Sequence, residues 1–180
     1  MKRLLPLILC VLLVWPVVGH AEGTSIGVVD VIYIMNNAEA SKHIQEQRNT
    51  MREDFLEEIS ETEQKLRSQE KALIEQRQKL SKEEYAKKRK EYEENLLKTR
   101  RYAQNKKQAL EGAANEGMNV LRAKLYEVVQ QIASERNYDL VISNKNVIAG
   151  ANALDITEEA LTRINADLTE VPLKKVTEEH

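Results

Sequence analysis

The chain has 180 residues, of which 31% are charged and 4% are aromatic, and its formal net charge is −2. This near-neutral balance excludes binding driven by a large overall charge. The composition is typical of long helices or coiled coils and disfavours a single large apolar core.

The N-terminus has the layout of a secretory signal peptide. A basic start is followed by the apolar run 4–18 and then by small residues at Gly19 and Ala21. A membrane anchor needs about 20 apolar residues, and this run is shorter. Lipidation at Cys10 is disfavoured by the bulky residue before it. We therefore expect export and cleavage after Ala21, which leaves a chain without cysteine.

A β-branched run at 25–31 predicts a strand. Residues 32–35 either continue this strand or begin a helical turn, and two asparagines then interrupt the pattern. No Gly-rich loop follows, which excludes a nucleotide-binding strand.

Residues 41–136 form the longest element that the sequence predicts. They contain no proline and are dominated by good helix formers, over a length far beyond the average helix of about 11–12 residues. Ser81 followed by Glu84 is a capping-box pattern, which marks a new helix start. We therefore expect two antiparallel helices that fold back near Ser81. The alternative is one continuous rod with an incidental serine.

Each predicted arm carries one thin apolar stripe, which supports a single seam but not a core. In the first arm the stripe consists of Ile44, Met51, Phe55, Ile59, Leu66, Leu73 and Leu80. In the second arm it consists of Tyr85, Tyr92, Leu96, Ala103, Leu110, Ala113, Gly117, Leu121, Leu125, Val128 and Ile132.

After the second arm the pattern changes to strands. Residues 138–143 and 147–150 predict two strands joined by a turn. Thr157 is placed to cap a final helix, and residues 171–180 read as a frayed tail.

The fold class that follows is mainly α with a small β head. Residues 22–40 and 137–170 form the β-rich head, and the hairpin of residues 41–136 is inserted between its strands. Because a head with so few apolar residues has a marginal core, we expect it to oligomerise.

Charge is distributed unevenly along the hairpin. Residues 65–101 hold 13 Lys and Arg against 7 Glu, whereas residues 41–64 and 137–180 are each acidic by four charges. A cluster of positive charge at the tip predicts electrostatic binding to anionic partners such as phospholipid or lipopolysaccharide head groups. The plain alternative is a solvated helix face with i,i+4 ion pairs. We call the following set the basic tip residues: Lys79, Lys82, Lys87, Lys88, Arg89, Lys90, Arg100 and Arg101.

Gly112 and Gly117 interrupt the second arm. Each costs a helix about 1 kcal/mol relative to alanine. Their small size allows close helix approach, and the functional alternative is a hinge at which the arm bends.

The sequence offers no catalytic set. His43 stands alone among polar residues, and no serine or cysteine has a histidine–acid context. Neighbouring carboxylates point to different helix faces. We expect no enzyme, cofactor or metal site, and export disfavours nucleic acid as a partner.

The order of these segments resembles the Skp/OmpH family of periplasmic chaperones. The resemblance rests on residues 26–30 and 33–40 at the start, and on residues 138–142 and 155–157 at the end. It covers essentially the whole mature chain.

The resemblance implies a homotrimer whose hairpins enclose a cavity. It also implies an ATP-independent holdase that shields unfolded outer-membrane β-barrel proteins. The best-known members are strongly basic, whereas this mature chain carries 25 Lys and Arg against 29 Asp and Glu. Apolar residues off the seam either line the client-facing side or pack; these are Leu56, Leu97, Tyr102 and Met118.

Two other classes of protein contain long helical hairpins or coiled coils. A periplasmic adaptor with a helical hairpin needs flanking lipoyl-like and barrel domains, for which too few residues remain. A passive structural coiled coil needs two strong apolar stripes, and the second stripe is weak.

Overall fold

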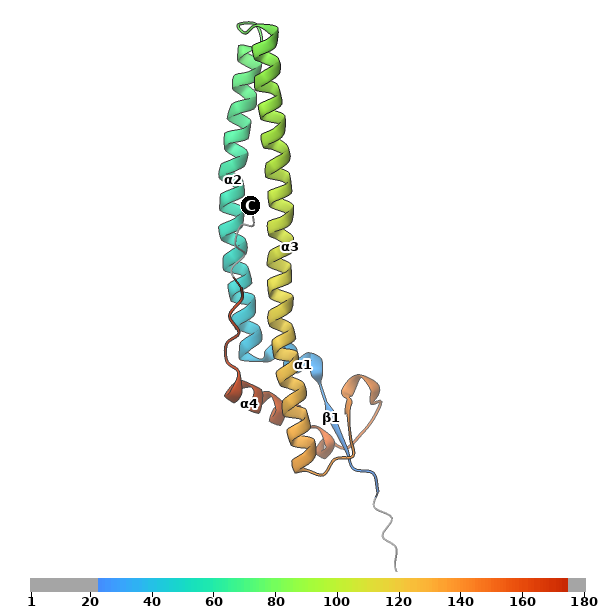
Figure 1. Ribbon diagram of the computed structural model, residues 1–180. Coiled ribbons are helices and arrows are strands. Elements are labelled where there is room, and N and C mark those ends of the chain that lie inside the picture. Colours follow the sequence, from blue (N-terminus) through green and yellow to red (C-terminus); the bar gives the residue numbers. More distant parts are fainter. Residues whose placement is uncertain (1–22, 175–180) are drawn as a thin grey trace, which may run out of the picture.

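The computed structural model describes residues 23–174, so the signal peptide predicted at residues 1–21 lies outside the described residues. The fold is mainly helical, with one long packed pair of helices projecting from a small head (Figure 1). The elements in order are β1 Ile26–Val29, α1 Val31–Asn37, α2 Glu39–Gln76, α3 Lys82–Glu135, β2 Leu140–Ser143 and α4 Thr157–Asp167. Two short 3₁₀ turns, Asn144–Asn146 and Asn152–Leu154, lie between β2 and α4.

The hairpin turns where the sequence predicts it. Helix α2 ends at Gln76, and Ser81 is the N-cap of α3. The Ser81 hydroxyl accepts from the Glu84 N–H at 3.2 Å, and the Glu84 carboxylate accepts from the Ser81 N–H at 3.1 Å. This reciprocal capping box satisfies two backbone donors that the first turn would otherwise leave unpaired.

Helix α3 ends at the head with Asn137 in the left-handed helical conformation. Asn137 has a φ of 51°, and the Tyr138 N–H donates to the Ala133 carbonyl at 2.9 Å. This is a Schellman-type ending, in which an Asn replaces the more usual Gly. It turns the chain sharply from α3 into β2.

The sheet consists of β1 and β2, which run parallel from Ile26 opposite Leu140 to Val29 opposite Ser143. Parallel strands require a long crossover, and here α1, α2 and α3 provide it. The predicted insertion of the hairpin between strands is therefore confirmed. On its other side, β1 forms an isolated parallel bridge from Val28 to Asp155.

The prediction of a strand at 147–150 is wrong. This stretch lies between the two 3₁₀ turns, and Ile148 is fully exposed at 105%. A 3₁₀ turn at Asn144–Asn146 follows β2 directly in place of a hairpin turn, so residues 147–150 do not pair with the outer edge of β2. The head is consequently less β-rich than the sequence predicts.

The start of the head is helical after one short strand. Residues 31–37 form α1, which resolves the two alternatives left open for residues 32–35. Asp30 caps this helix, since its carboxylate accepts from the Tyr33 N–H at 2.8 Å.

Thr157 does not cap α4, contrary to the prediction. Its hydroxyl instead accepts from the Asp30 N–H at 2.8 Å, a contact between residues 127 positions apart. The Asp155 carboxylate accepts from the Thr157 N–H. The threonine therefore ties the two halves of the head together.

One core joins the head to the lower hairpin. Its members come from α1, the start of α2, the lower half of α3, α4 and the C-terminal segment. The fully buried large side chains are Ile34, Ser41, Ile44, Leu121, Leu125, Val128, Ile132, Ile156 and Ile164. Higher up the hairpin, Leu66 and Leu110 are the buried seam residues. Packing therefore weakens from the head towards the tip.

Candidate functional site

The projecting hairpin is the main candidate surface. Helix α2 has 38 residues and α3 has 54. At 1.5 Å per residue these lengths correspond to about 57 Å and 81 Å. Figure 1 shows the two helices side by side, with the head at the end remote from the turn. No helix within residues 23–174 is long and apolar enough to cross a membrane.

The basic tip residues do not all lie at the tip. Lys79 is in the turn, and Lys82 begins α3. Residues 87–90 lie within the first turns of α3. Arg100 and Arg101 lie about 18 residues after Lys82, which places them on the order of 27 Å from the start of α3. All eight side chains are exposed.

Some of these cations are paired on the helix surface. Arg89 contacts Glu93 at 2.8 Å, and Lys90 lies 3.9 Å from Glu94. Surface pairs of this kind contribute little to stability and leave the residues accessible. Within the described chain, Lys82 and Lys87 have no ion-pair partner, and the turn therefore keeps a positive surface.

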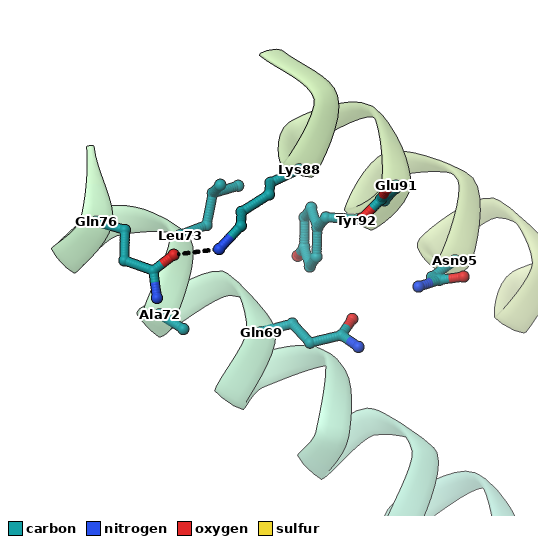
Figure 2. A pocket seen from close by; sticks show the side chains of 8 residues that line it. All are labelled: Gln69, Ala72, Leu73, Gln76, Lys88, Glu91, Tyr92 and Asn95. Carbon is teal, nitrogen blue, oxygen red and sulfur yellow. Dashed lines mark hydrogen bonds between the residues drawn. The ribbon is translucent and has the colours of Figure 1, made fainter. Parts of the chain in front are cut away.

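A cavity of about 220 Å³ opens between α2 and α3 just below the turn. Figure 2 shows Tyr92 and Lys88 reaching from α3 towards Gln69 and Leu73 of α2. The Lys88 ammonium donates to the Gln76 side-chain carbonyl at 2.6 Å. Glutamines stand where a second apolar stripe would close this gap, so the seam is open here.

A polar contact replaces apolar packing midway along the arm. The Tyr102 hydroxyl donates to Glu58, and the Lys106 ammonium donates to the same hydroxyl at 2.9 Å. Burial, followed by the hydrogen bond to Glu58, raises the pKa of Tyr102 above its ordinary value. The contact fixes the alignment of α2 against α3 where few apolar residues do so.

Several apolar side chains on the arms remain exposed. Leu56 and Leu97 are each 53% exposed and Ile74 is 67% exposed. Met118, by contrast, packs against the main core, and Tyr102 is held by Glu58. Of the four off-seam residues singled out in the sequence, two are thus open to solvent and two are engaged.

The two glycines of α3 have different surroundings. A side chain added at Gly112 would meet nothing within 4 Å. At Gly117 an added Cβ would lie 2.7 Å from Leu173 and 3.3 Å from Ile44. Gly117 therefore permits close contact between α2, α3 and the C-terminal segment.

The C-terminal segment is ordered against the hairpin as far as residue 174. Val171 and Leu173 are 5% and 9% exposed, and Figure 1 shows this segment running beside α2. The prediction of a frayed tail is wrong for residues 171–174. Residues 175–180 lie outside the described chain.

Charged residues join α4 to the lower end of α3. Arg163 donates to both oxygens of Glu135, at 2.8 and 2.6 Å, and to Glu159 at 2.6 Å. The hydrogen bond from Arg163 lowers the pKa of Glu135, and the same contact raises the pKa of Arg163. This network holds the head at a set position on the arm.

The head also presents apolar side chains to solvent. Ile32 is 45% exposed, Tyr33 42% and Leu140 49%. With the fully exposed Ile148, they leave apolar area uncovered on α1, on β2 and on the loop after β2 of a head whose sheet has only two strands. Isolated sheets of this size are marginal in water.

The described residues offer little for catalysis. No group of three or more His, Cys, Asp or Glu within residues 23–174 could hold a metal ion. The His43 ring contacts the Gln47 side chain on its own helix at 3.1 Å.

This combination defines a class of protein: a small α/β head that carries one long, sparsely packed helical hairpin. A family model described as outer membrane protein (OmpH-like) matches residues 25–164. The chain therefore belongs to the OmpH-like, or Skp, family, whose chaperones are not enzymes.

A solved structure supports the same fold. A protein described as an OmpH-like outer membrane chaperone, from Caulobacter crescentus CB15, is 12% identical and superposes with a TM-score of 0.79. The match covers 87% of this chain and 93% of that one. No curated protein matches the chain in sequence.

Proposed function

We propose that this protein is a periplasmic, ATP-independent holdase that binds unfolded outer-membrane β-barrel proteins and prevents their aggregation. The observation that carries the proposal is the hairpin with exposed Leu56, Ile74 and Leu97. These side chains are spread along an arm whose own seam is too thin to collapse on them. Many weak apolar contacts suit a client that must stay unfolded and be released.

The proposed working form is a homotrimer assembled through the head. Uncovered Ile32, Tyr33 and Leu140 beside an open two-stranded sheet support self-association. Three hairpins on one head would enclose a client-sized space. Solution mass measurement that finds only monomer at micromolar concentration would contradict this part of the proposal.

The basic tip residues are proposed to contact anionic membrane lipid or lipopolysaccharide. Their exposure and the excess of positive charge around the turn support this role. Such contacts would bring held clients close to the membrane into which they insert.

Gly112 and Gly117 are the two interior glycines of α3 at which the arm could bend. We keep the hinge as a proposal for Gly112, which stands in open surroundings within α3. Measuring arm mobility in a Gly112→Ala variant tests it, since alanine stiffens a helix without adding a clash here.

The rival function is a passive structural coiled coil. One dilution experiment separates the two functions. An outer-membrane barrel protein unfolded in urea is diluted into buffer with and without the full chain, and light scattering is followed. The holdase predicts that scattering is suppressed once the chaperone is in excess. A passive coiled coil leaves scattering unchanged.

A further inference from the structure

The C-terminal segment packs against the base of the hairpin with alternating buried and exposed residues. Along residues 171–174 the side chains alternate between buried and exposed, with Val171 and Leu173 inward and Pro172 and Lys174 outward. This period of two is that of an extended strand with one buried face. We call residues 171–173 the strap.

A side chain of α2 takes the place of a neighbouring strand. The Gln47 amide nitrogen donates to the Val171 carbonyl at 2.8 Å. The Gln47 carbonyl oxygen accepts from the Leu173 N–H at 3.0 Å. These backbone groups are two residues apart, as are those that one strand offers to its neighbour in a parallel ladder. Gln47 therefore recognises extended backbone, whatever its sequence.

The second part of the site is a socket for an apolar side chain. Leu173 lies against Ile44 of α2 and over Gly117 of α3, where an added Cβ would be 2.7 Å from it. The socket therefore exists because Gly117 has no side chain. Beyond it, Lys174 forms an ion pair with Glu116 at 2.8 Å, although its side chain is 82% exposed.

The site thus combines backbone recognition with pockets for alternate side chains. This is how proteins bind extended peptides by β-strand addition, in which backbone bonds give affinity and alternate pockets give selectivity. Transmembrane β-strands have the matching pattern, because apolar and polar residues alternate along them.

We propose that the groove formed by Ile44, Gln47 and Gly117 is a binding site for extended peptide segments with apolar residues at alternate positions. The strap is its resident occupant in cis. The identity of the competing ligand, an unfolded β-barrel strand, rests on the proposed holdase function; the site itself does not. The strap keeps the groove covered until such a segment replaces it.

Exchange is feasible because both competitors are tethered. A short linker gives the strap a millimolar effective concentration, so a weak site stays occupied in the empty chaperone. A client already held on the arms reaches a similar effective concentration at the groove. Free peptides at low concentration do not.

The test follows the strap in the full chain by the distance between two spin labels. One label replaces exposed Arg48, beside Gln47, and the other replaces exposed Pro172, in a background with Cys10→Ser. The probe is a synthetic peptide of about ten residues that alternates Leu and Thr. Its control has the same composition arranged as a Leu block and a Thr block. We expect a short, narrow distance that broadens with the alternating peptide and persists with the control.

Two substitutions separate a binding site from a structural brace. Leu173→Ser frees the groove and should bind the alternating peptide about tenfold more tightly, if the strap otherwise covers the site nine-tenths of the time. Gln47→Leu frees the strap but damages the site, and it should not gain affinity. Thr169→Ser, at an exposed position outside the strap, is the matched control and should bind as the parent does.

The proposal is overturned if the alternating peptide leaves the distance unchanged at saturation, or if both peptides displace the strap equally. It is also overturned if Leu173→Ser and the parent chain bind the peptide equally. Suppression of client aggregation is scored separately. If peptide displaces the strap but the chain does not suppress aggregation of an unfolded barrel protein, the peptide site is supported and the holdase function is contradicted.

Discussion

Tyr102 on α3 donates a hydrogen bond to Glu58 on α2, although the two residues are 44 positions apart in the chain. The contact lies between the well-packed base of the hairpin and its open tip. The arm therefore depends on a polar bond where the apolar seam is thin.

Tyr102→Phe removes this bond and the one that the hydroxyl accepts from Lys106, and it leaves the ring in place. We expect a loss of about 1 kcal/mol in the free energy of unfolding, the usual net contribution of a hydrogen bond, because the ion pair between Lys106 and Glu58 remains. Urea unfolding followed by circular dichroism measures it. Tyr126→Phe is the matched control, because Tyr126 is 59% exposed on the same helix. Equal stability of the two variants would show that the cross-arm bond contributes nothing.

Ser81→Ala removes the cap of α3. Loss of an N-cap side chain costs about 1 kcal/mol, and here the cost should be local because the tip is far from the core. Hydrogen exchange should speed up at the first amides of α3 while the base stays protected. Ser68→Ala is the control, since the Ser68 hydroxyl only donates to the Gln64 carbonyl of its own helix. Faster exchange at the head in Ser81→Ala would contradict a local role.

The Arg163 network predicts a dependence of stability on pH. The hydrogen bond from Arg163 lowers the pKa of Glu135 from its ordinary value of 4.5. A depressed carboxyl pKa stabilises the folded state above the ordinary value, and this stabilisation is lost as pH falls through the folded value.

Glu135→Gln tests that dependence. We expect the melting temperature of the variant to lie below that of the parent at pH 7. The difference should shrink as the pH is lowered past 4.5, the ordinary pKa of the group. Glu111→Gln, at an exposed position of the same helix, is the control and should change little at any pH. A difference that persists unchanged in acid would mean that the charge of Glu135 is not what stabilises the joint.

The basic tip residues predict salt-dependent membrane binding. Replacing Lys87, Lys88, Arg89 and Lys90 by Gln should weaken binding to vesicles of anionic phospholipid, most visibly at low salt. Vesicle co-sedimentation measures the effect. The control removes the same number of charges from exposed positions near the base: Lys42, Arg48, Arg52 and Lys107. If both variants lose vesicle binding equally, the basic tip residues are ordinary solvated surface charges and not a membrane contact.

The hairpin was predictable because its signals are local. The Ser81–Glu84 capping box lies within one turn, and the seam residues recur at helical spacing. Both patterns can therefore be recognised from the local sequence, without knowledge of distant contacts. The wrong predictions fall where distant contacts decide. Residues 147–150 have strand-like composition, but the 3₁₀ turn at Asn144–Asn146 carries the chain away from β2 instead of folding it back as a hairpin.

Long-range contacts also explain why the predictions for Thr157 and for residues 171–174 were wrong. Thr157 has the residue type and position of a helix cap, but its hydroxyl accepts a hydrogen bond from the Asp30 N–H instead. Pro172 and the charged residues after it are typical of a frayed tail, yet proline also suits an extended segment. Nothing near residue 172 in the sequence indicates that Gln47 and Gly117 are spaced to receive it.

The central claim is that a trimer holds an unfolded client in soluble form. The mass of the complex tests this most directly, after a urea-unfolded outer-membrane barrel protein is diluted into excess full chain. We predict a soluble species with the mass of three chains plus one client, in which the client lacks the circular dichroism of a folded barrel. Recovery of the client in the pellet, with the chain soluble and alone, would contradict the account.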